Sequence, residues 1–190
     1  QSSPSRTSML SGKFAHTIGT EDLHNGLNAE TLILPTYLHR AGYVTASMLK
    51  THWGPNGDKQ FDVRIKGDYL PNQGPLSDEL FQNYNKFLDE NKDKPFFIWV
   101  GFIDPHRPYN RNNTEQQNDP KKIQVPPYLV NNDKTKRDMA DYYNEISRMD
   151  NNIGTMMDEL DKRGLTDNTI FVFMSDNGMP FPRCKGTLYD

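Results

Sequence analysis

Asp176 and Asn177 are the side chains of this sequence best suited to hold a hard metal cation. They stand together in Ser175-Asp176-Asn177-Gly178, directly after an apolar run. Carboxylate and amide oxygens favour calcium or magnesium over zinc. The alternative is an Asx-type turn at the end of a strand, because Asp-Asn-Gly is a strong turn former, and both interpretations can hold together. A six-coordinate cation would need more oxygens than this pair supplies.

The first residues of the chain offer a candidate nucleophile. Ser2 lies just ahead of a predicted short helix over residues 5–10, whose backbone N–H groups can hold anionic oxygens. Arg6 follows about one helical turn after Ser2 and can steady a negative charge there. A plain serine hydroxyl is a weak nucleophile. The alternative is that Ser2 and Ser5 only cap the helix.

Two lysines and two histidines are candidates for gripping an anion and moving protons. They are Lys50 and His52 in Lys50-Thr51-His52, His106 in Asp104-Pro105-His106, and Lys185. For each lysine the alternative is a solvated surface charge. For each histidine it is a structural ring bonded to backbone.

The elements that would position these residues alternate between helix and strand. Three apolar runs predict buried strands, and between them apolar residues recur at helical spacing. This alternation predicts an α/β sandwich, with a largely parallel central sheet flanked by helices. The predicted strands are 44–49, 96–102 and 170–174, and the predicted helices are 31–40, 78–90 and 135–163.

The candidate residues begin where the predicted strands end. Lys50 and His52 follow the first strand, His106 follows the second, and Asp176 follows the third. In open parallel sheets, ligands bind beyond the carboxyl ends of the strands. The sequence therefore predicts that these side chains converge on one edge of the sheet.

Length and composition exclude several classes of protein. The chain has 190 residues, enough for one domain with a core of its own. It has 22 basic and 25 acidic residues, and this net charge of -3 argues against a general nucleic-acid binder. No apolar run reaches the ~18–20 residues of a membrane span. A single cysteine excludes an internal disulfide.

Taken in chain order, these motifs resemble those of the type I sulfatases. Ser2-Ser3-Pro4-Ser5-Arg6 resembles the family's (Cys/Ser)-x-Pro-x-Arg maturation signature, and Lys50-Thr51-His52 its Lys-x-His. The later motifs resemble its x-Pro-His, its Asp-Asn metal pair, its next basic residue and its acidic turn. The run from Asp176 to Tyr189 is most similar to the N-sulfoglucosamine sulfohydrolase (heparan sulfamidase) branch. These later residues are Asp104, Pro105, His106, Asp176, Asn177, Lys185, Tyr189 and Asp190.

The resemblance implies a role for each candidate. A sulfatase-maturing enzyme would oxidise Ser2 to formylglycine, the nucleophile, and Arg6 would steady it. Ca²⁺, with Mg²⁺ as the alternative, would bind Ser2, Asp176 and Asn177. Lys50 and Lys185 would grip the sulfate oxygens, although sulfamidases often carry arginine in place of Lys185. His106 would serve the leaving group, His52 would take the proton that expels sulfate, and His16 and Arg183 would contact the sugar.

The implied function is hydrolysis of a sulfate ester or sulfamate on a sulfated, glycosaminoglycan-like carbohydrate. A phosphodiesterase or phosphonate hydrolase of the same alkaline-phosphatase-like fold is one alternative. A non-catalytic protein that binds sulfated glycans is the other. Because the chain opens and closes inside motifs, residues 1–190 are expected to be a partial catalytic domain, without the N-terminal metal-ligand strand and the C-terminal region. The resemblance further implies a periplasmic or secreted bacterial enzyme.

Overall fold

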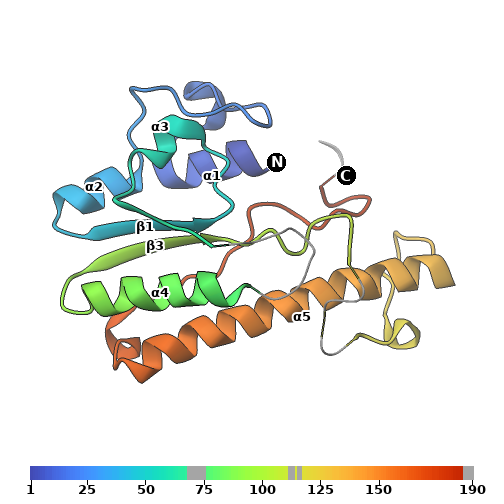
Figure 1. The fold of residues 1–190 in the computed structure, drawn as a ribbon. Coiled ribbons are helices and arrows are strands. Elements are labelled where there is room, and N and C mark those ends of the chain that lie inside the picture. The colour runs from blue at the N-terminus through green and yellow to red at the C-terminus, as the bar shows by residue number, and fades with distance from the viewer. Residues whose placement is uncertain (68–75, 111–113, 115–116, 186–190) are drawn as a thin grey trace. The chain divides into compact units, whose positions relative to one another are not determined.

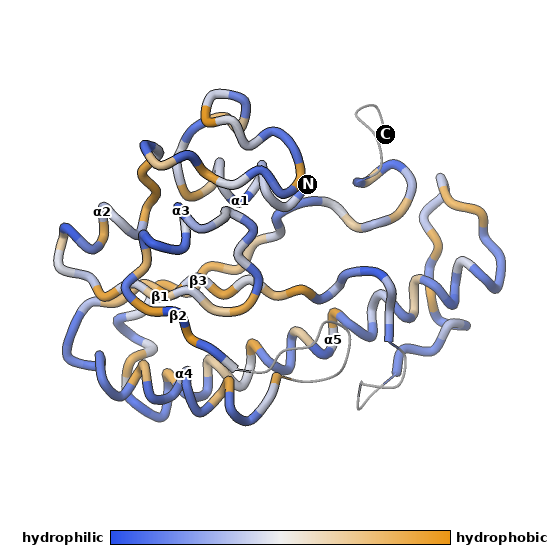
Figure 2. The backbone as a smooth tube through the Cα atoms, turned by 45° about the horizontal axis from the view of Figure 1, so that its top comes forward, coloured by the Kyte–Doolittle hydropathy of each residue, from blue (hydrophilic) through white to orange (hydrophobic). Residues whose placement is uncertain are grey.

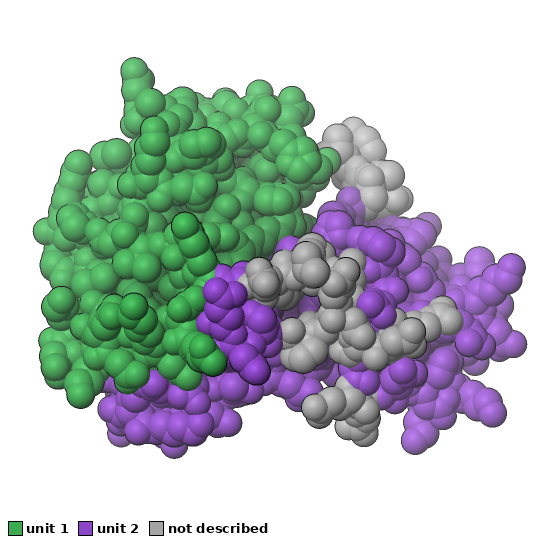
Figure 3. Space-filling model, viewed as in Figure 1, with its two compact units in different colours: residues 1–66, 82–101, 169–178 green, residues 67–81, 102–168, 179–190 purple. Residues whose placement is uncertain are grey.

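The structure is a computed structural model that describes residues 1–67, 76–110, 114 and 117–185. The chain divides into two compact units (Figure 3). The first unit comprises Gln1–Lys66, Gln82–Gly101 and Thr169–Gly178, and the second comprises Gly67–Phe81, Phe102–Asn168 and Met179–Asp190. Each unit is described by itself below.

The first unit contains a parallel sheet of three strands in the order β2-β1-β3 (Figure 1). The central strand is β1 (Val44–Leu49), and it pairs with β2 (Val63–Ile65) and with β3 (Phe96–Gly101). All but the first residue of β1 are buried. Figure 2 shows β1 and β3 as apolar segments, the pattern of strands covered on both faces.

Helices cover both faces of this sheet (Figure 1). On one face lie α1 (Ser2–Ser11), α2 (Leu34–Arg40) and α3 (Gly54–Asp58), and on the other lie residues 82–91 of α4 (Asp78–Asn91). The core under the first three helices contains stacked aromatic rings, with Trp53 fully buried against Phe61 and Trp99. This arrangement confirms the predicted α/β sandwich with a parallel sheet.

The second unit is built on α5 (Asp133–Lys162). The Asn132 side chain caps its first turn by accepting the Thr135 N–H. Gly164 follows its end with φ 65°, the left-handed conformation that favours glycine. The helix predicted over residues 135–163 therefore forms, but it begins at Asp133 and ends at Lys162. Among the described residues, short 3₁₀ turns are η1 (Ala15–Thr17), η2 (Pro120–Lys122) and η3 (Thr166–Asn168).

The prediction of a buried strand over residues 170–174 is wrong. These residues have no regular structure, and their apolar side chains are exposed, Ile170 by 92% and Val172 by 69%. A strand needs a neighbour to complete its ladder of hydrogen bonds. Among the described residues, this segment pairs with neither β2 nor β3.

Other predicted boundaries also change. Helix α2 begins at Leu34 rather than at residue 31. Helix α1 begins at Ser2 rather than Ser5, so the candidate nucleophile lies in the first helical turn. Strand β3 ends at Gly101 rather than Phe102. None of the helices in the described ranges has the length and apolar character needed to cross a bilayer.

Candidate active site

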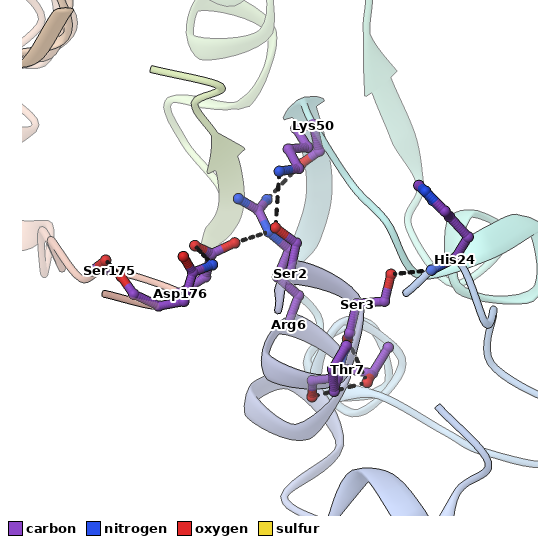
Figure 4. Close-up of polar contacts among 10 residues, drawn as sticks. Ser2, Ser3, Arg6, Thr7, His24, Lys50, Ser175 and Asp176 are labelled. Carbon is purple, nitrogen blue, oxygen red and sulfur yellow. Dashed lines mark hydrogen bonds and ion pairs between the residues drawn. The ribbon is translucent and has the colours of Figure 1, made fainter. Parts of the chain in front are cut away.

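Ser2 and Lys50 meet at the carboxyl end of β1 (Figure 4). Ser2 is buried, with only 5% of its surface exposed. Lys50 Nζ donates a hydrogen bond to Ser2 Oγ at 2.9 Å. Gln1 occupies the N-cap position of α1, without a side-chain cap bond. The serine hydroxyl is therefore used in a tertiary contact with a lysine, and the helix-capping alternative for Ser2 finds no support.

Arg6 joins this pair to Asp176. Its side chain is nearly buried, with Nε 2.9 Å from Asp176 Oδ2 and Nη1 2.9 Å from the Lys50 carbonyl oxygen. Burial opposes ionisation of Asp176, but hydrogen bonds from Arg6 and Ser2 and the charges of Arg6 and Lys50 outweigh it and lower its pKa. Two cations and one carboxylate surround the serine, which leaves one net positive charge for an anion.

The backbone after β1 is held in an uncommon conformation. Leu49 and His52 both have positive φ, 63° and 61°, which is rare outside glycine. Such conformations persist where surrounding structure imposes them, and they concentrate at functional sites. Arg64 of β2 donates to the Leu49 carbonyl oxygen and helps to hold this segment. The strained turn projects Lys50 toward Ser2 (Figure 4).

Gly101 gives Lys50 and Arg6 the space they need at the end of β3. A Cβ at this position would collide with the Lys50 carbonyl oxygen and lie 2.5 Å from Arg6 Nη1. We expect Gly101→Ala to destabilise the protein by at least about 2 kcal/mol, because the obstructing oxygen is backbone. Thermal unfolding measures this change. Gly154→Ala on α5 is the matched control, since a Cβ there meets nothing within 4 Å. Equal melting temperatures for the two variants would contradict the prediction.

His52 is held in its neutral form. Burial lowers its pKa from 6.5 to about 4, aided by the charges of Lys50, Arg6 and His24 and opposed by Asp176. Its buried Nδ1 has no hydrogen-bond partner within the part of the chain that the structure describes. At neutral pH this ring carries no charge, so it can accept a proton.

His24 is a neighbour of the site that the sequence did not reveal. Its ring centroid lies 5.5 Å from that of His52. Its backbone N–H donates to Ser3 Oγ at 3.1 Å, and Thr7 and Thr20 share a second bond between α1 and the same loop at 2.7 Å. Both bonds are made by buried hydroxyls of α1 next to Ser2 (Figure 4). The helix therefore fixes His24 and Ser2 together.

Asp176 and Asn177 supply only part of a cation site. Asn177 Nδ2 donates to Asp176 Oδ1 at 2.7 Å, and the other carboxylate oxygen binds Arg6. Among the residues that are described, His, Cys, Asp and Glu side chains nowhere gather in threes as around a metal ion. Carboxylate and amide oxygens suit calcium or magnesium, but these residues cannot complete six-fold coordination.

The other predicted site residues are His16 in the first unit and His106, Arg183 and Lys185 in the second. His16 is exposed in η1 and stacks on Phe14, and the described chain shows no hydrogen bond or ring contact between it and the Ser2 cluster. His106, Arg183 and Lys185 are exposed and belong to the second unit. The structure thus brings together Ser2, Arg6, Lys50, His52 and Asp176, with Asn177 adjacent. Tyr189 and Asp190 lie outside the described residues.

The sequence matches one family along nearly its whole length. The family model described as Sulfatase matches residues 1–189. N-sulphoglucosamine sulphohydrolase of Homo sapiens is 31% identical, over 98% of this chain and 43% of the relative. An ulvan-active sulfatase of Formosa agariphila is 27% identical, over 98% of this chain and 37% of the relative. The chain thus spans less than half the length of these relatives.

Solved structures agree with this match at the level of the fold. A phosphonate monoester hydrolase of Agrobacterium radiobacter superimposes with a TM-score of 0.69 at 17% identity, over 93% of this chain and 53% of that chain. A structure in complex with D-glucosamine-2-N,6-O-disulfate gives a TM-score of 0.60 at 19% identity, over 89% and 54%. At such identities the likeness shows the fold alone, and it confirms the predicted alkaline-phosphatase-like class.

Proposed function

The chain belongs to the sulfatase family, and from that premise we propose that it forms catalytic machinery for hydrolysing a sulfate ester or sulfamate on a sulfated, glycosaminoglycan-like sugar. The proposal extends to a protein longer than these residues, since the relatives are more than twice as long. We propose a periplasmic or secreted location for that protein, on the basis of the resemblance to bacterial sulfatases.

The observation that carries the proposal is the hydrogen-bonded cluster of Ser2, Lys50, Arg6 and Asp176. Two of its members, Arg6 and Asp176, are 170 positions apart in the sequence. A buried hydroxyl beside two cations suits a nucleophile that attacks an anionic group. Neutral His52 lies next to this cluster and supplies a base.

Each residue then has a chemical task. Formylglycine, once formed from Ser2, supplies a hydrated aldehyde oxygen that attacks sulfur. Lys50 and Arg6 hold the negative charge that this attack concentrates on the oxygens. His106 gives a proton to the alcohol or amine as its bond to sulfur breaks, and His52 takes a proton as sulfate departs.

The cofactor and the remaining contacts are part of the same proposal. Asp176 and Asn177 would contribute oxygens to one Ca²⁺ or Mg²⁺, together with Ser2 after oxidation and with ligands from outside residues 1–190. Lys185 would hold sulfate oxygens, and His16 and Arg183 would contact the sugar. Among the described residues, Asp176 and Asn177 complete only part of the shell of such a cation.

The test measures modification and turnover on the same full-length protein, co-expressed with a maturing enzyme. Mass spectrometry of the Ser2 peptide should show the loss of two hydrogen atoms. The protein should release sulfate from an aryl sulfate and from N-sulfoglucosamine. Intact Ser2 with glycan binding and no turnover would identify a non-catalytic relative. Faster turnover of a phosphonate monoester than of either sulfate would instead identify a phosphonate hydrolase.

The loss of turnover at acidic pH should follow the protonation of His52. If neutral His52 accepts the proton, kcat stays constant as pH falls and halves only near pH 4, where the ring becomes charged. The pH dependence of aryl sulfate hydrolysis measures this limb. His24→Asn should move it upward, because His24 is among the charges that lower the pKa of His52. A limb at about pH 6.5, the ordinary value for histidine, would contradict the assignment.

A further inference from the structure

Buried charges on α5 hold the loop that carries His106. Asp104 and Arg148 form a bidentate ion pair, with Arg148 Nε 2.8 Å from Asp104 Oδ2 and Nη2 2.7 Å from Oδ1. Both side chains are almost fully buried, 1% and 3% exposed. A planar guanidinium held at two points fixes the direction of the carboxylate as well as its distance. The residue that begins the loop is therefore anchored to the helix.

Glu145, one turn earlier on α5, closes the loop. Its Oε2 accepts the backbone N–H of His106 and its Oε1 that of Asn110, both at 3.1 Å. The Glu145 side chain is fully buried. One carboxylate thus binds both ends of the segment from residue 106 to 110.

A third residue of α5 holds the side chain that follows His106. Asp138 accepts two bonds from Arg107, at 2.8 and 2.6 Å, and the Arg107 guanidinium lies over the Tyr109 ring. Asp138, Glu145 and Arg148 are spaced by seven and three residues, so they share one face of the helix. Arg107 is therefore a structural partner of α5.

The held backbone also fixes the His106 ring. Its Nδ1 lies 2.6 Å from the Arg107 carbonyl oxygen. A carbonyl only accepts hydrogen bonds, so Nδ1–H donates to it. To act as a proton donor, the ring must carry a second proton, and in that imidazolium form Nε2–H is the group left to face a leaving group. The His106 ring itself is exposed, while Asp104, Glu145 and Arg148, which hold the loop, are buried.

We propose that Glu145 and Arg148 are positioning residues that aim His106 Nε2 at the leaving group. The inference rests on the proposed role of His106 in the sulfatase reaction. Neither residue is assigned to the Ser2 cluster. They act by holding the loop. Arg148 binds the Asp104 side chain, and Glu145 binds the backbone N–H groups of His106 and Asn110.

The ionisation of Glu145 points to a role other than stability. Burial raises its pKa to about 7, and the charge of Asp104 adds to this effect. The backbone bonds to Asn110 and His106 and the charge of Arg148 oppose it. A neutral amide of the same shape would be easier to bury than this carboxyl. Glu145→Gln should therefore keep or raise the melting temperature, yet it offers only one acceptor oxygen where the loop presents two N–H groups.

The experiment compares Glu145→Gln with Glu159→Gln in the full-length enzyme. Glu159 is the matched control, because it is a carboxylate of α5 whose ion pairs among the described residues are with Lys162 and Arg163, at the end of the helix. Hydrogen exchange of the peptide containing residues 104–110 should accelerate at least tenfold in Glu145→Gln and not in the control. For aryl sulfates with poor leaving groups, kcat/KM should fall about 10- to 100-fold, with less than about a threefold change for good ones.

A double variant separates positioning from packing. Glu145→Gln combined with His106→Ala should be no slower than His106→Ala alone, because both changes remove the same proton donor. Additive losses, or unchanged exchange of the loop, would overturn the inference. If His106→Ala itself leaves the leaving-group dependence unchanged, the proposed role of His106 is wrong, and the positioning role of Glu145 and Arg148 falls with it.

Arg148→Lys provides a second route if Glu145→Gln does not fold. It keeps the positive charge and loses the bidentate grip on Asp104. The same acceleration of exchange and the same selective loss with poor leaving groups are expected. Normal exchange and a uniform loss of activity would mean that Arg148 only supports folding.

Discussion

Asp176→Ala should lower sulfatase turnover by at least about 10³-fold in the full-length protein. Removing one preorganised group that stabilises charge in the transition state costs about 10²–10³ in kcat. Here the partner left behind is Arg6, whose side chain is 7% exposed and also binds the Lys50 carbonyl. The substitution would release the guanidinium that the proposal places beside the attacked sulfate. It would also remove an oxygen proposed for the cation.

The control for this prediction is Ser175→Ala. Ser175 Oγ donates to the Asn177 carbonyl oxygen at 2.5 Å, so this variant disturbs the turn and spares the ion pair. Its turnover should stay within about threefold of the parent enzyme, in line with the loss of one exposed hydrogen bond. Steady-state hydrolysis of an aryl sulfate and calorimetric titration with calcium measure both variants. Unchanged turnover in Asp176→Ala, with calcium still bound, would show that Asp-Asn-Gly serves only as a turn.

The structure supports the Asp176 interpretation in a way the sequence did not foresee. From the sequence, Asp176 was a cation ligand or a turn residue and Arg6 a partner of the nucleophile. The ion pair between them spans 170 residues, and no local pattern encodes such a contact. The motifs singled out both residues, while the pairing between them depends on the tertiary fold.

The strands show the same limit of prediction from the sequence. An apolar run correctly predicted β1, which has a neighbour on each side. A run of the same kind at 170–174 failed, because burial depends on a pairing partner that the run itself does not specify. Strand β2 was missed for the opposite reason. It has only three residues, two of them exposed, too short for a periodic signal.

The sequence pattern of α5 did not reveal the charged residues that this helix buries. The apolar spacing predicted a helix over residues 135–163, and the apolar residues Met139 and Leu160 of that helix are buried. The same helix also buries Glu145 and Arg148. Charged residues are almost never fully buried unless paired, and their partners lie in a loop more than 30 residues away. Helical periodicity describes which side faces inward, but it does not reveal that an inward position carries a charge.

His52→Ala should allow one catalytic cycle to begin and then stop it. The side chain is the base proposed to take the proton as sulfate departs, and its low pKa keeps it neutral for that task. Without it, the bond between sulfur and the phenol oxygen still breaks, because Lys50, Arg6 and His106 remain. We expect a burst of one phenol per active site from an aryl sulfate, followed by a rate reduced about 10²–10⁴-fold, the usual contribution of a general base.

His106→Ala is the matched comparison, since it removes a histidine assigned to the other half of the reaction. It should show no burst, and its rate should fall most for phenols with poor leaving ability, because these need a proton as they depart. Rapid-quench measurement of phenol, with intact-mass analysis for sulfate retained on the protein, distinguishes the two variants. A His52→Ala enzyme that turns over slowly, without a burst and without retained sulfate, would place His52 in the first step and exchange the roles proposed for the two histidines.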